Sequence, residues 1–403
     1  MGTAIAVVNS GSTSLKFAVY GSGNHQFEVL CRGVVDGMKT TPHFVMKDKE
    51  GKPLETHEWG EGQAIEHGKA LAFAIGRFEK HMPMVKIAAA GHRVVLGGQR
   101  FHGPVLIEGD VLDYLESLAA MEQTHQPYNV AAAREIAHSF PDLPQVACFD
   151  TSFHRTMPEI AQVYALPAEL RNAGIHHWGF HGLSYEYISK QISKYAPGAR
   201  RVIVAHLGGG ASMCAMLDGE SVETTMGFGA VSGLPMGTRS GDVPLDALFY
   251  LLRSKRYDPA GLETILSQKS GLLGLSETSS DMREIESSAD PRAKLAFDYF
   301  VYSIVKYAGA YTSVLGGLDA IVFTAGIGEN SAEVRAAVCT KLGWLGMSVD
   351  PAANKKHGPL ISTKDSEVSV WVIPTDEELM IAMHTQALTA PKQGFLKERY
   401  YAG

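Results

Sequence analysis

The 403-residue chain is about twice the size of a typical domain, so two domains are expected. Hydrophobic residues make up 45% and charged residues 20%, a composition typical of a folded globular protein and unlike that of a disordered or fibrous one. The net charge of −7 argues against nucleic acid and anionic membranes as partners, because such partners require clustered lysine and arginine.

The four cysteines, Cys31, Cys148, Cys214 and Cys339, are far apart and form no CxxC pair. This pattern favours buried thiols in a reducing compartment over a disulfide framework or a zinc site. The N-terminus enters an apolar strand without a basic segment or a signal-like apolar segment before it. No apolar run approaches the ~20 residues that cross a bilayer. We therefore expect a cytoplasmic protein.

In chain order, the first third predicts strands joined by turns, followed by a charged loop over 47–62. Helical patterns mark 63–80 and 112–139, with an apolar strand over 86–95 between them. Pro127 suits the first turn of a helix, where its missing N–H is not needed. The stretch 144–154 reads as a strand that ends in a polar loop.

The second half predicts a strand pair over 201–217, helices near 244–267 and 292–315, and a strand, glycine loop and helix over 319–338. A strand over 368–374 precedes a final helical pattern. Strands that alternate with helices indicate an α/β fold. We place an N-terminal domain at 1–150 and a C-terminal domain at 151–385, with a last helix over about 386–403 packing back on the first.

Residues 5–20 and 202–217 have the same shape: an apolar strand, a short polar or glycine-rich turn, and a second apolar strand. This similarity suggests two copies of one structural unit. Over so few residues, a chance pair of hairpins explains it as well.

The first of these turns, NSGSTSLK (9–16), is rich in hydroxyl side chains and backbone N–H groups that can bind phosphate oxygens. A polar hairpin that satisfies its own backbone is the alternative. HLGGGAS (206–212) and TAGIGENS (324–331) are further candidates, the latter with Asn330 and Glu333 as a capping box. Neither the dinucleotide-binding nor the P-loop pattern is present, so a nucleotide would be bound by several separate turns.

Two arginines stand beside glycines, Arg93 in GHRVVLGG and Arg239 in MGTRSGD. Each could bind an anion bidentately, or form a surface ion pair. His177 and His181 have a metal-like spacing, but Gly179 interrupts the helix that it requires, so zinc is disfavoured. Donation to an oxyanion or a place in the core remains open for His181.

Carboxylates follow two strands. Asp150 ends one, where a side chain can project into a site. In PTDEELMIA, Thr375 and Glu378 match a capping box, which leaves Glu377 as the candidate for holding magnesium, through water.

Together the motifs resemble those of the acetate kinase family, within the sugar kinase, Hsp70 and actin superfamily. The resemblance runs nearly end to end and rests on NSGSTSLK, GHRVVLGG, CFDTSFHRTMP, GFHGLSYEY, MGTRSGD and FTAGIGENSAEVR, in that order. It implies two duplicated ribonuclease-H-like domains that flank an active-site cleft. It also implies reversible, direct in-line transfer of the ATP γ-phosphoryl group to acetate, giving acetyl phosphate and ADP.

The resemblance carries residue roles with it. The implied catalytic residues are Asp150, Arg93, Arg239 and His181. The implied substrate-binding residues are Arg93, Val95, Thr124, His125, Phe180 and Ala230. The implied nucleotide and phosphate contacts are Asn9, Ser12, Ser14, Lys16, His206, Leu207, Gly208, Gly209, Gly210, Asp281, Met282, Arg283, Gly326, Ile327, Gly328 and Asn330. Asn9 and Glu377 would organise Mg²⁺, for which Mn²⁺ could substitute, and a homodimer is expected.

Two positions depart from the family pattern in the predicted acyl pocket. The family typically has leucine where this chain has Thr124, and proline where it has Ala230. Both changes reduce side-chain volume, and a methylene in such a pocket is worth only ~1–3 kcal/mol in discrimination. Propionate is therefore the alternative acceptor. A non-catalytic nucleotide-binding scaffold is a further alternative, disfavoured because it would not need Arg93 and Arg239 together with Asp150 and Glu377. A sugar kinase is another, disfavoured because the arginine pair suits a carboxylate acceptor better than neutral hydroxyls.

Overall fold

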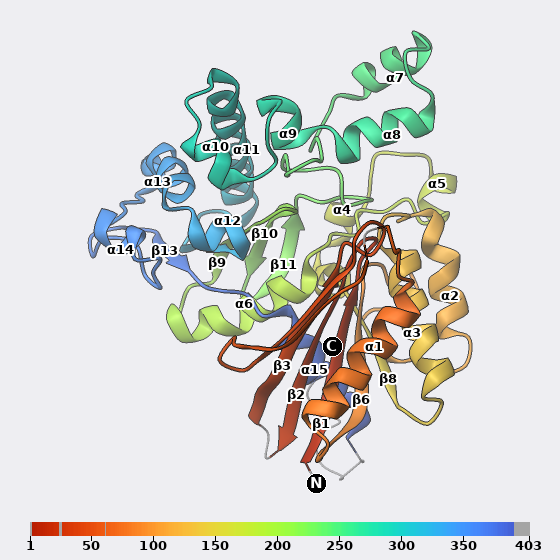
Figure 1. Ribbon diagram of the computed structural model, residues 1–403. Helices are drawn as coiled ribbons and strands as arrows, with labels where there is room; N and C mark the ends of the chain where they lie inside the picture. The colour runs from red at the N-terminus through yellow and green to blue at the C-terminus, as the bar shows by residue number, and fades with distance from the viewer. Residues whose placement is uncertain (1, 24–25, 61, 391–403) are drawn as a thin grey trace. The chain divides into compact units, whose positions relative to one another are not determined.

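The computed structural model describes residues 2–23, 26–60 and 62–390, which form two compact units (Figure 1). The described residues up to Ser152 belong to the first unit, which resumes at Glu377, and the second unit is Phe153–Asp376. The sequence-based domain limits, 150 and 385, stay predictions. The compact units divide at slightly different points, so that α15 (Glu377–Thr389) lies wholly in the first unit. Most of the predicted last helix, 391–403, lies outside the described residues.

The first unit is built on an eight-stranded sheet in the order β5-β4-β3-β2-β1-β6-β8-β7. The strands are β1 (Gly2–Ser10), β2 (Leu15–Gly23), β3 (Gln26–Asp36), β4 (His43–Asp48), β5 (Pro53–Glu58), β6 (Val85–Val94), β7 (Val105–Leu106) and β8 (Gln145–Phe149). Strands β1, β2 and β3 form an antiparallel meander, whereas β1, β6 and β8 run parallel. The carboxyl ends of these three parallel strands therefore meet at one edge of the sheet.

Helices cover both faces of this sheet. They are α1 (His67–His81), α2 (Val111–Ser117), α3 (Gln126–Ser139) and α15. Successive residues of β6 point to opposite faces. Ala90 belongs to the core that α1 and α3 complete, whereas Gly91 lies under α15, where an added Cβ would clash with Thr385 and Ile381. Only glycine lets this helix pack so closely on the strand.

Two predictions in this unit were wrong in part. The charged stretch 47–62 is not all loop, because Pro53–Glu58 forms β5, an edge strand paired with β4. The helical pattern over 112–139 is interrupted between α2 and α3 by a 3₁₀ turn and a loop. Pro127 does lie in the first turn of α3, as predicted.

The second unit contains a five-stranded sheet in the order β11-β10-β9-β12-β13. The strands are β9 (Arg201–Leu207), β10 (Ala211–Leu217), β11 (Glu220–Thr224), β12 (Ala320–Thr324) and β13 (Ser369–Val372). Their order and directions repeat those of β3-β2-β1-β6-β8 in the first unit. The predicted internal repeat is therefore confirmed, with β1–β2 equivalent to β9–β10.

The helices of the second unit are α4 (Glu159–Gln162), α5 (Ala168–Asn172), α6 (Gly182–Tyr195), α7 (Leu245–Arg253), α8 (Pro259–Gln268), α9 (Gly271–Ser276), α10 (Met282–Ser287), α11 (Pro291–Leu315), α12 (Ala325–Asn330), α13 (Ala332–Lys341) and α14 (Pro351–Lys355). The predicted glycine loop after β12 is in fact α12, which starts at Ala325 with a positive φ of 63°. The cap of the next helix was also predicted wrongly. Ser331, one residue later than Asn330, accepts from the Val334 N–H.

The four cysteines are buried thiols, none of which forms a disulfide. Within the described ranges, no helix is long and apolar enough to cross a bilayer.

Candidate active site

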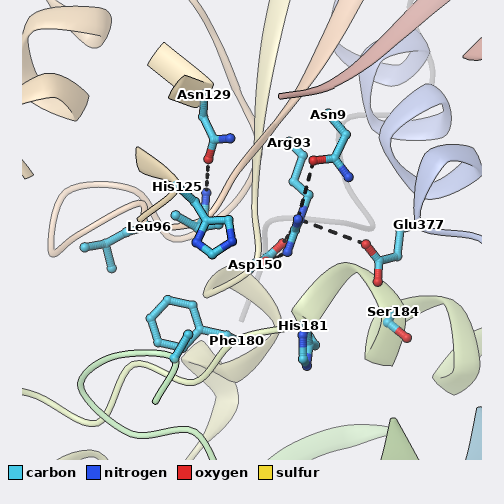
Figure 2. Close-up of polar contacts among 12 residues, drawn as sticks. Asn9, Arg93, Leu96, His125, Asn129, Asp150, Phe180, His181, Ser184 and Glu377 are labelled. Carbon is cyan, nitrogen blue, oxygen red and sulfur yellow. Dashed lines mark hydrogen bonds and ion pairs between the residues drawn. The ribbon is translucent and has the colours of Figure 1, made fainter. Parts of the chain in front are cut away.

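Arg93, at the end of β6, is the centre of a polar cluster in the first unit (Figure 2). Its Nε and Nη2 donate to the two carboxylate oxygens of Asp150, at 3.0 and 2.6 Å. Its Nη1 donates to Asn9 Oδ1 at 3.4 Å, and its Nε lies 4.0 Å from a carboxylate oxygen of Glu377. The cluster forms because β1, β6 and β8 end at the same edge and α15 begins there.

Burial dominates the electrostatics of this cluster. The side chain of Asp150 is only 2% exposed, and that of Arg93 17%. Burial raises the pKa of Asp150, and the adjacent Arg93 guanidinium opposes this rise. Burial would lower the pKa of Arg93, but the charges of Asp150 and Glu377 raise it, so the guanidinium is firmly cationic.

The first turn connects β1 to β2 and carries the predicted phosphate contacts Ser12 and Ser14. The Gly11 N–H donates to the Ser14 carbonyl at 2.8 Å and closes the turn. Lys16 pairs with Asn9 in the strand register and is exposed. Within the described residues, the buried Ser10 hydroxyl at the end of β1 has no hydrogen-bond partner. Such an atom is normally satisfied by water or a ligand.

The start of α3 supports the residues around Val95. Asn129 accepts from the Val95 N–H at 3.1 Å and donates to the Ser10 carbonyl at 2.6 Å. Gln126 accepts from the Leu96 N–H and donates to the Leu96 carbonyl, both at 3.1 Å. These two amides tie the ends of β1 and β6 to one helix. Neither amide was predicted from the sequence.

In the second unit, the predicted histidines His181 and His206 stack with their ring centroids 4.2 Å apart. His181 Nδ1 lies 2.8 Å from Ser212 Oγ, and His206 Nδ1 lies 2.8 Å from Ser184 Oγ. His181 itself has a left-handed backbone, with φ 58°, at the N-cap of α6. Each ring is thus oriented through Nδ1 by a serine hydroxyl.

The glycine turn Leu207–Gly210 lies beside these rings. A Cβ added at Gly210 would lie 3.3 Å from His181 Nε2 and 3.9 Å from Arg239 Nη1. The Gly208 N–H donates to the Gly210 carbonyl, and Gly209 accepts from the Gly237 N–H. The structure therefore brings the predicted residues His181, Arg239 and Gly210 together.

Arg239 is held by the loop that contains Ala230. Its Nη1 donates to the Ala230 carbonyl at 3.0 Å. Phe180 is buried and is held by His154, whose Nε2 lies 2.9 Å from the Phe180 carbonyl. His154 is an unpredicted support, and Gly179 leaves room for its ring, which a Cβ would contact.

The predicted adenosine side consists of the start of α10 and of α12. Asp281 is the N-cap of α10 and accepts from the Arg283 N–H at 2.9 Å, and Arg283 also pairs with its carboxylate. Met282 is buried. In α12, Asn330 Nδ2 donates to the Gly326 carbonyl at 2.8 Å. Ile327 and Gly328 lie in the same helix, Gly328 buried.

Two residues that the sequence analysis missed hold this side together. Ser331, directly after α12, donates to Glu286 of α10. Arg335 is fully buried and donates to the Gly328 and Glu329 carbonyls at 2.8 and 2.9 Å. It also donates to the side-chain oxygen of Asn354 at 2.7 Å and to the backbone carbonyl of Asn354 at 2.8 Å. Arg335 thus fixes α12 against α14.

The predicted capping box at 375–378 was wrong. Within the described chain the Thr375 hydroxyl has no hydrogen-bond partner, and Glu378 pairs with Arg32 at 3.1 Å. Glu377 lies 4.0 Å from Arg93 Nε, and its magnesium role stays a prediction. His177 lies 3.7 Å from Glu223, in an ion-pair position.

The comparisons with known proteins agree with one another. A model of the acetokinase family matches residues 4–383. An acetate kinase of Nitrobacter hamburgensis is 46% identical over 387 residues, which cover 95% of this chain and 96% of that protein. A propionate kinase from Francisella tularensis superposes with a TM-score of 0.89 at 37% identity, covering 96% of this chain and all of the other. Porphyromonas gingivalis acetate kinase superposes with a TM-score of 0.86 at 35% identity, covering 96% of this chain and 99% of the other. The predicted fold class is confirmed.

Proposed function

Because the chain belongs to the acetokinase family, we propose that it transfers the γ-phosphoryl group of ATP to acetate, reversibly, giving acetyl phosphate and ADP. One observation supports this most directly. Arg93 lies among Asp150, Asn9 and Glu377 at the carboxyl ends of the parallel strands. A guanidinium held in place by acidic and amide side chains suits a site that must position anions.

In this proposal a carboxylate oxygen attacks the γ-phosphorus in line, and the bond to the β-phosphate oxygen breaks. Arg93 and Arg239 bind the acceptor carboxylate and the moving phosphoryl group, and His181 stabilises the phosphoryl charge during transfer. Most of the catalysis is positioning and charge neutralisation, because phosphoryl transfer needs little covalent help. The turn at 11–14 and the turn at 207–210 bind phosphates, and α10 and α12 bind adenosine.

The reaction would use Mg²⁺, and the residues present fit it. Among the described residues there is no group of three His, Cys, Asp or Glu side chains placed to hold a metal ion. Asn9, Asp150 and Glu377 nevertheless carry hard oxygen donors beside Arg93, and magnesium at phosphate sites typically uses one or two carboxylates, water and substrate oxygens. These residues would hold the ion, which neutralises phosphate charge.

Propionate is the second candidate acceptor. A propionate kinase is among the close structural neighbours. Thr124 and Ala230 are smaller than the residues that the family typically has there. Acetate stays first, because the other predicted pocket residues, such as Val95 and Phe180, are buried and can compensate.

A non-catalytic scaffold or a sugar kinase is less consistent with the site. A scaffold has no need of the buried Arg93–Asp150 pair together with Glu377 and Arg239, and neutral sugar hydroxyls do not need two arginines.

We also propose a homodimer. One side of α11 exposes large apolar side chains, whereas the other is buried in the second unit. The exposed residues are Leu295, Tyr299, Tyr302 and Val314. Light scattering on wild type and Tyr302→Lys tests this, and a monomeric wild type would exclude the dimer.

The function is tested by incubating the protein with ATP, Mg²⁺ and acetate and following the phosphorus signals by ³¹P NMR. The expected result is loss of the γ-phosphate signal and equal growth of an acyl phosphate signal. Release of inorganic phosphate without acyl phosphate, or no reaction with any short carboxylate, would exclude the proposal.

A further inference from the structure

Glu122, in the loop before α3, is a carboxylate that is only 7% exposed. Acidic side chains are rarely buried unless they are paired. Its Oε2 accepts from the backbone N–H groups of His125 and Gln126, at 2.7 and 3.1 Å. These groups begin α3 and have no partner within the helix, and the His125 side chain does not cap it. Glu122 therefore caps α3 from outside and complements its dipole.

The other carboxylate oxygen faces two side chains of the predicted acyl site. Thr124 Oγ1 donates to Glu122 Oε1, and His125 Nδ1 lies 3.2 Å from the same oxygen. Burial raises the pKa of Glu122, but hydrogen bonds from His125 and Thr124 outweigh it and bring the pKa to about 2. Glu122 is accordingly ionised at neutral pH and can only accept.

This determines the direction of each hydrogen bond. Since an ionised carboxylate has no proton, the Thr124 hydroxyl must be the donor to it. Thr124 Oγ1 is then left as an acceptor, and it lies 2.8 Å from His125 Nδ1. Both oxygens beside Nδ1 are acceptors, so Nδ1 carries a proton. Nε2 is consequently the ring nitrogen that can face a ligand.

We propose that Glu122 is a positioning residue for the acceptor side of the kinase reaction, which holds the His125 ring and the Thr124 side chain in one orientation. The inference rests on the proposed function, because His125 and Thr124 are acceptor residues only there. Glu122 does not touch substrate. It acts through the His125 ring, through the Thr124 hydroxyl, and through the start of α3, whose Asn129 supports Val95.

The position of Glu122 predicts which of the two KM values, for the acceptor or for ATP, changes when Glu122 is lost. The residues that Glu122 holds lie in the first unit beside Val95, whereas α10 and α12, the proposed adenosine elements, are in the second unit. Loss of Glu122 is therefore expected to raise KM for the acceptor and to leave KM for ATP nearly unchanged. A general loss of folded protein would lower kcat for all substrates and change neither KM selectively.

The test uses the full-length enzyme with Glu122→Gln, which keeps size and shape but removes the charge. Exposed Glu108→Gln is the matched control, with the same change of charge. The expected results are a roughly 10-fold rise in acetate KM, equivalent to about 1.4 kcal/mol, and an ATP KM within twofold of wild type. Glu108→Gln should match wild type in both constants.

The second readout is the His125 imidazole ¹⁵N spectrum, assigned with His125→Asn. Wild type should show a protonated Nδ1, and Glu122→Gln a mixture of tautomers. A bare Nδ1 in wild type, or equal changes in both KM values in Glu122→Gln, would overturn the proposal. The wild-type spectrum tests the predicted proton on His125 Nδ1 even if the Glu122→Gln variant does not fold. If no acceptor is turned over, the proposed function fails and the acceptor role of Glu122 fails with it, whereas the spectrum still tests whether Glu122 orients the His125 ring.

Discussion

Arg93 and Asp150 share two hydrogen bonds, Nε to Oδ1 at 3.0 Å and Nη2 to Oδ2 at 2.6 Å, across the ends of two neighbouring parallel strands. Asp150 therefore fixes the plane of the guanidinium, and Arg93 can bind an anion only through the edge that remains. Nη1 of the same group donates to Asn9, and Glu377 lies 4.0 Å from Nε.

Asp150→Ala is expected to destabilise the protein as well as inactivate it. Breaking a buried ion pair leaves the other charge uncompensated, and the cost is about 3 kcal/mol of unfolding free energy. Urea unfolding measures this. Exposed Asp110→Ala, which loses an ion pair with Arg100 in solvent, is the control and should cost less than about 1 kcal/mol. An equal loss of unfolding free energy in the two variants would show that the Arg93–Asp150 pair stabilises the fold no more than an exposed ion pair does.

Arg239→Ala should keep the fold and lose at least ~100-fold in kcat, because positioned charge supplies most of the catalysis in phosphoryl transfer. Circular dichroism checks the fold, and acyl phosphate formation measures turnover. Near-normal turnover would remove Arg239 from the catalytic residues.

Thr124→Leu should raise the ratio of kcat/KM for acetate over propionate about 10-fold, because it restores volume to the predicted acyl wall. Thr124→Val is the matched control. It removes the hydroxyl that Glu122 accepts from but keeps the volume, so it should leave the ratio near that of wild type. If the ratio is the same in all three proteins, this wall does not set the acceptor preference.

Arg335→Met is expected to raise KM for ATP about 30-fold with a smaller change in kcat, because the variant loses both hydrogen bonds to the α12 carbonyls, each worth about 1 kcal/mol. Exposed Arg256→Met removes the same charge elsewhere and serves as the control. A folded Arg335→Met protein with an unchanged ATP KM would mean that α12 does not position the nucleotide.

Stability should fall in acid before the carboxylates titrate. Burial lowers the pKa of His154 to about 4, although its hydrogen bond to the Phe180 carbonyl opposes the change. Burial lowers the pKa of His92 to about 4 in the same way, opposed by Gln145. Because both values lie below the ~6.5 of an unfolded chain, the unfolded state binds more protons between pH 6.5 and 4. The stability is complete above pH 6.5 and is lost as the pH falls through this window.

Each of these histidines contributes a slope of up to about 1.4 kcal/mol per pH unit. Urea unfolding of His154→Gln over this range should show one such slope fewer than wild type. Exposed His138→Gln should keep the wild-type slope. An unchanged slope in His154→Gln would mean that His154 binds protons equally in the folded and unfolded states, so that burial does not lower its pKa.

The parts of the fold that depend on local pattern could be predicted from the sequence. Apolar strands, the repeat of 5–20 in 202–217 and Pro127 in the first turn of α3 all follow from patterns a few residues long. The strand Pro53–Glu58 could not be found this way, since its charged sequence becomes a strand only by pairing with β4.

In the site, too, residues marked by a local sequence pattern could be predicted, and residues that depend on distant partners could not. Arg93, Asp150, Asn9 and Glu377 follow strand ends or begin a helix, and the structure brings them together. Arg335 and Glu122 were missed because their roles come from burial and from partners that no local pattern reveals. A signal did exist for Ser331, since serine is a favoured N-cap and stands beside the Asn330 that was chosen instead.

Phosphorylation of a short carboxylate is tested by measuring kcat/KM for acyl phosphate formation from ATP and Mg²⁺ with acetate, propionate and butyrate. We expect turnover that is highest with acetate, with propionate second and butyrate far below both. Absence of acyl phosphate with all three acceptors, from folded protein, would contradict it.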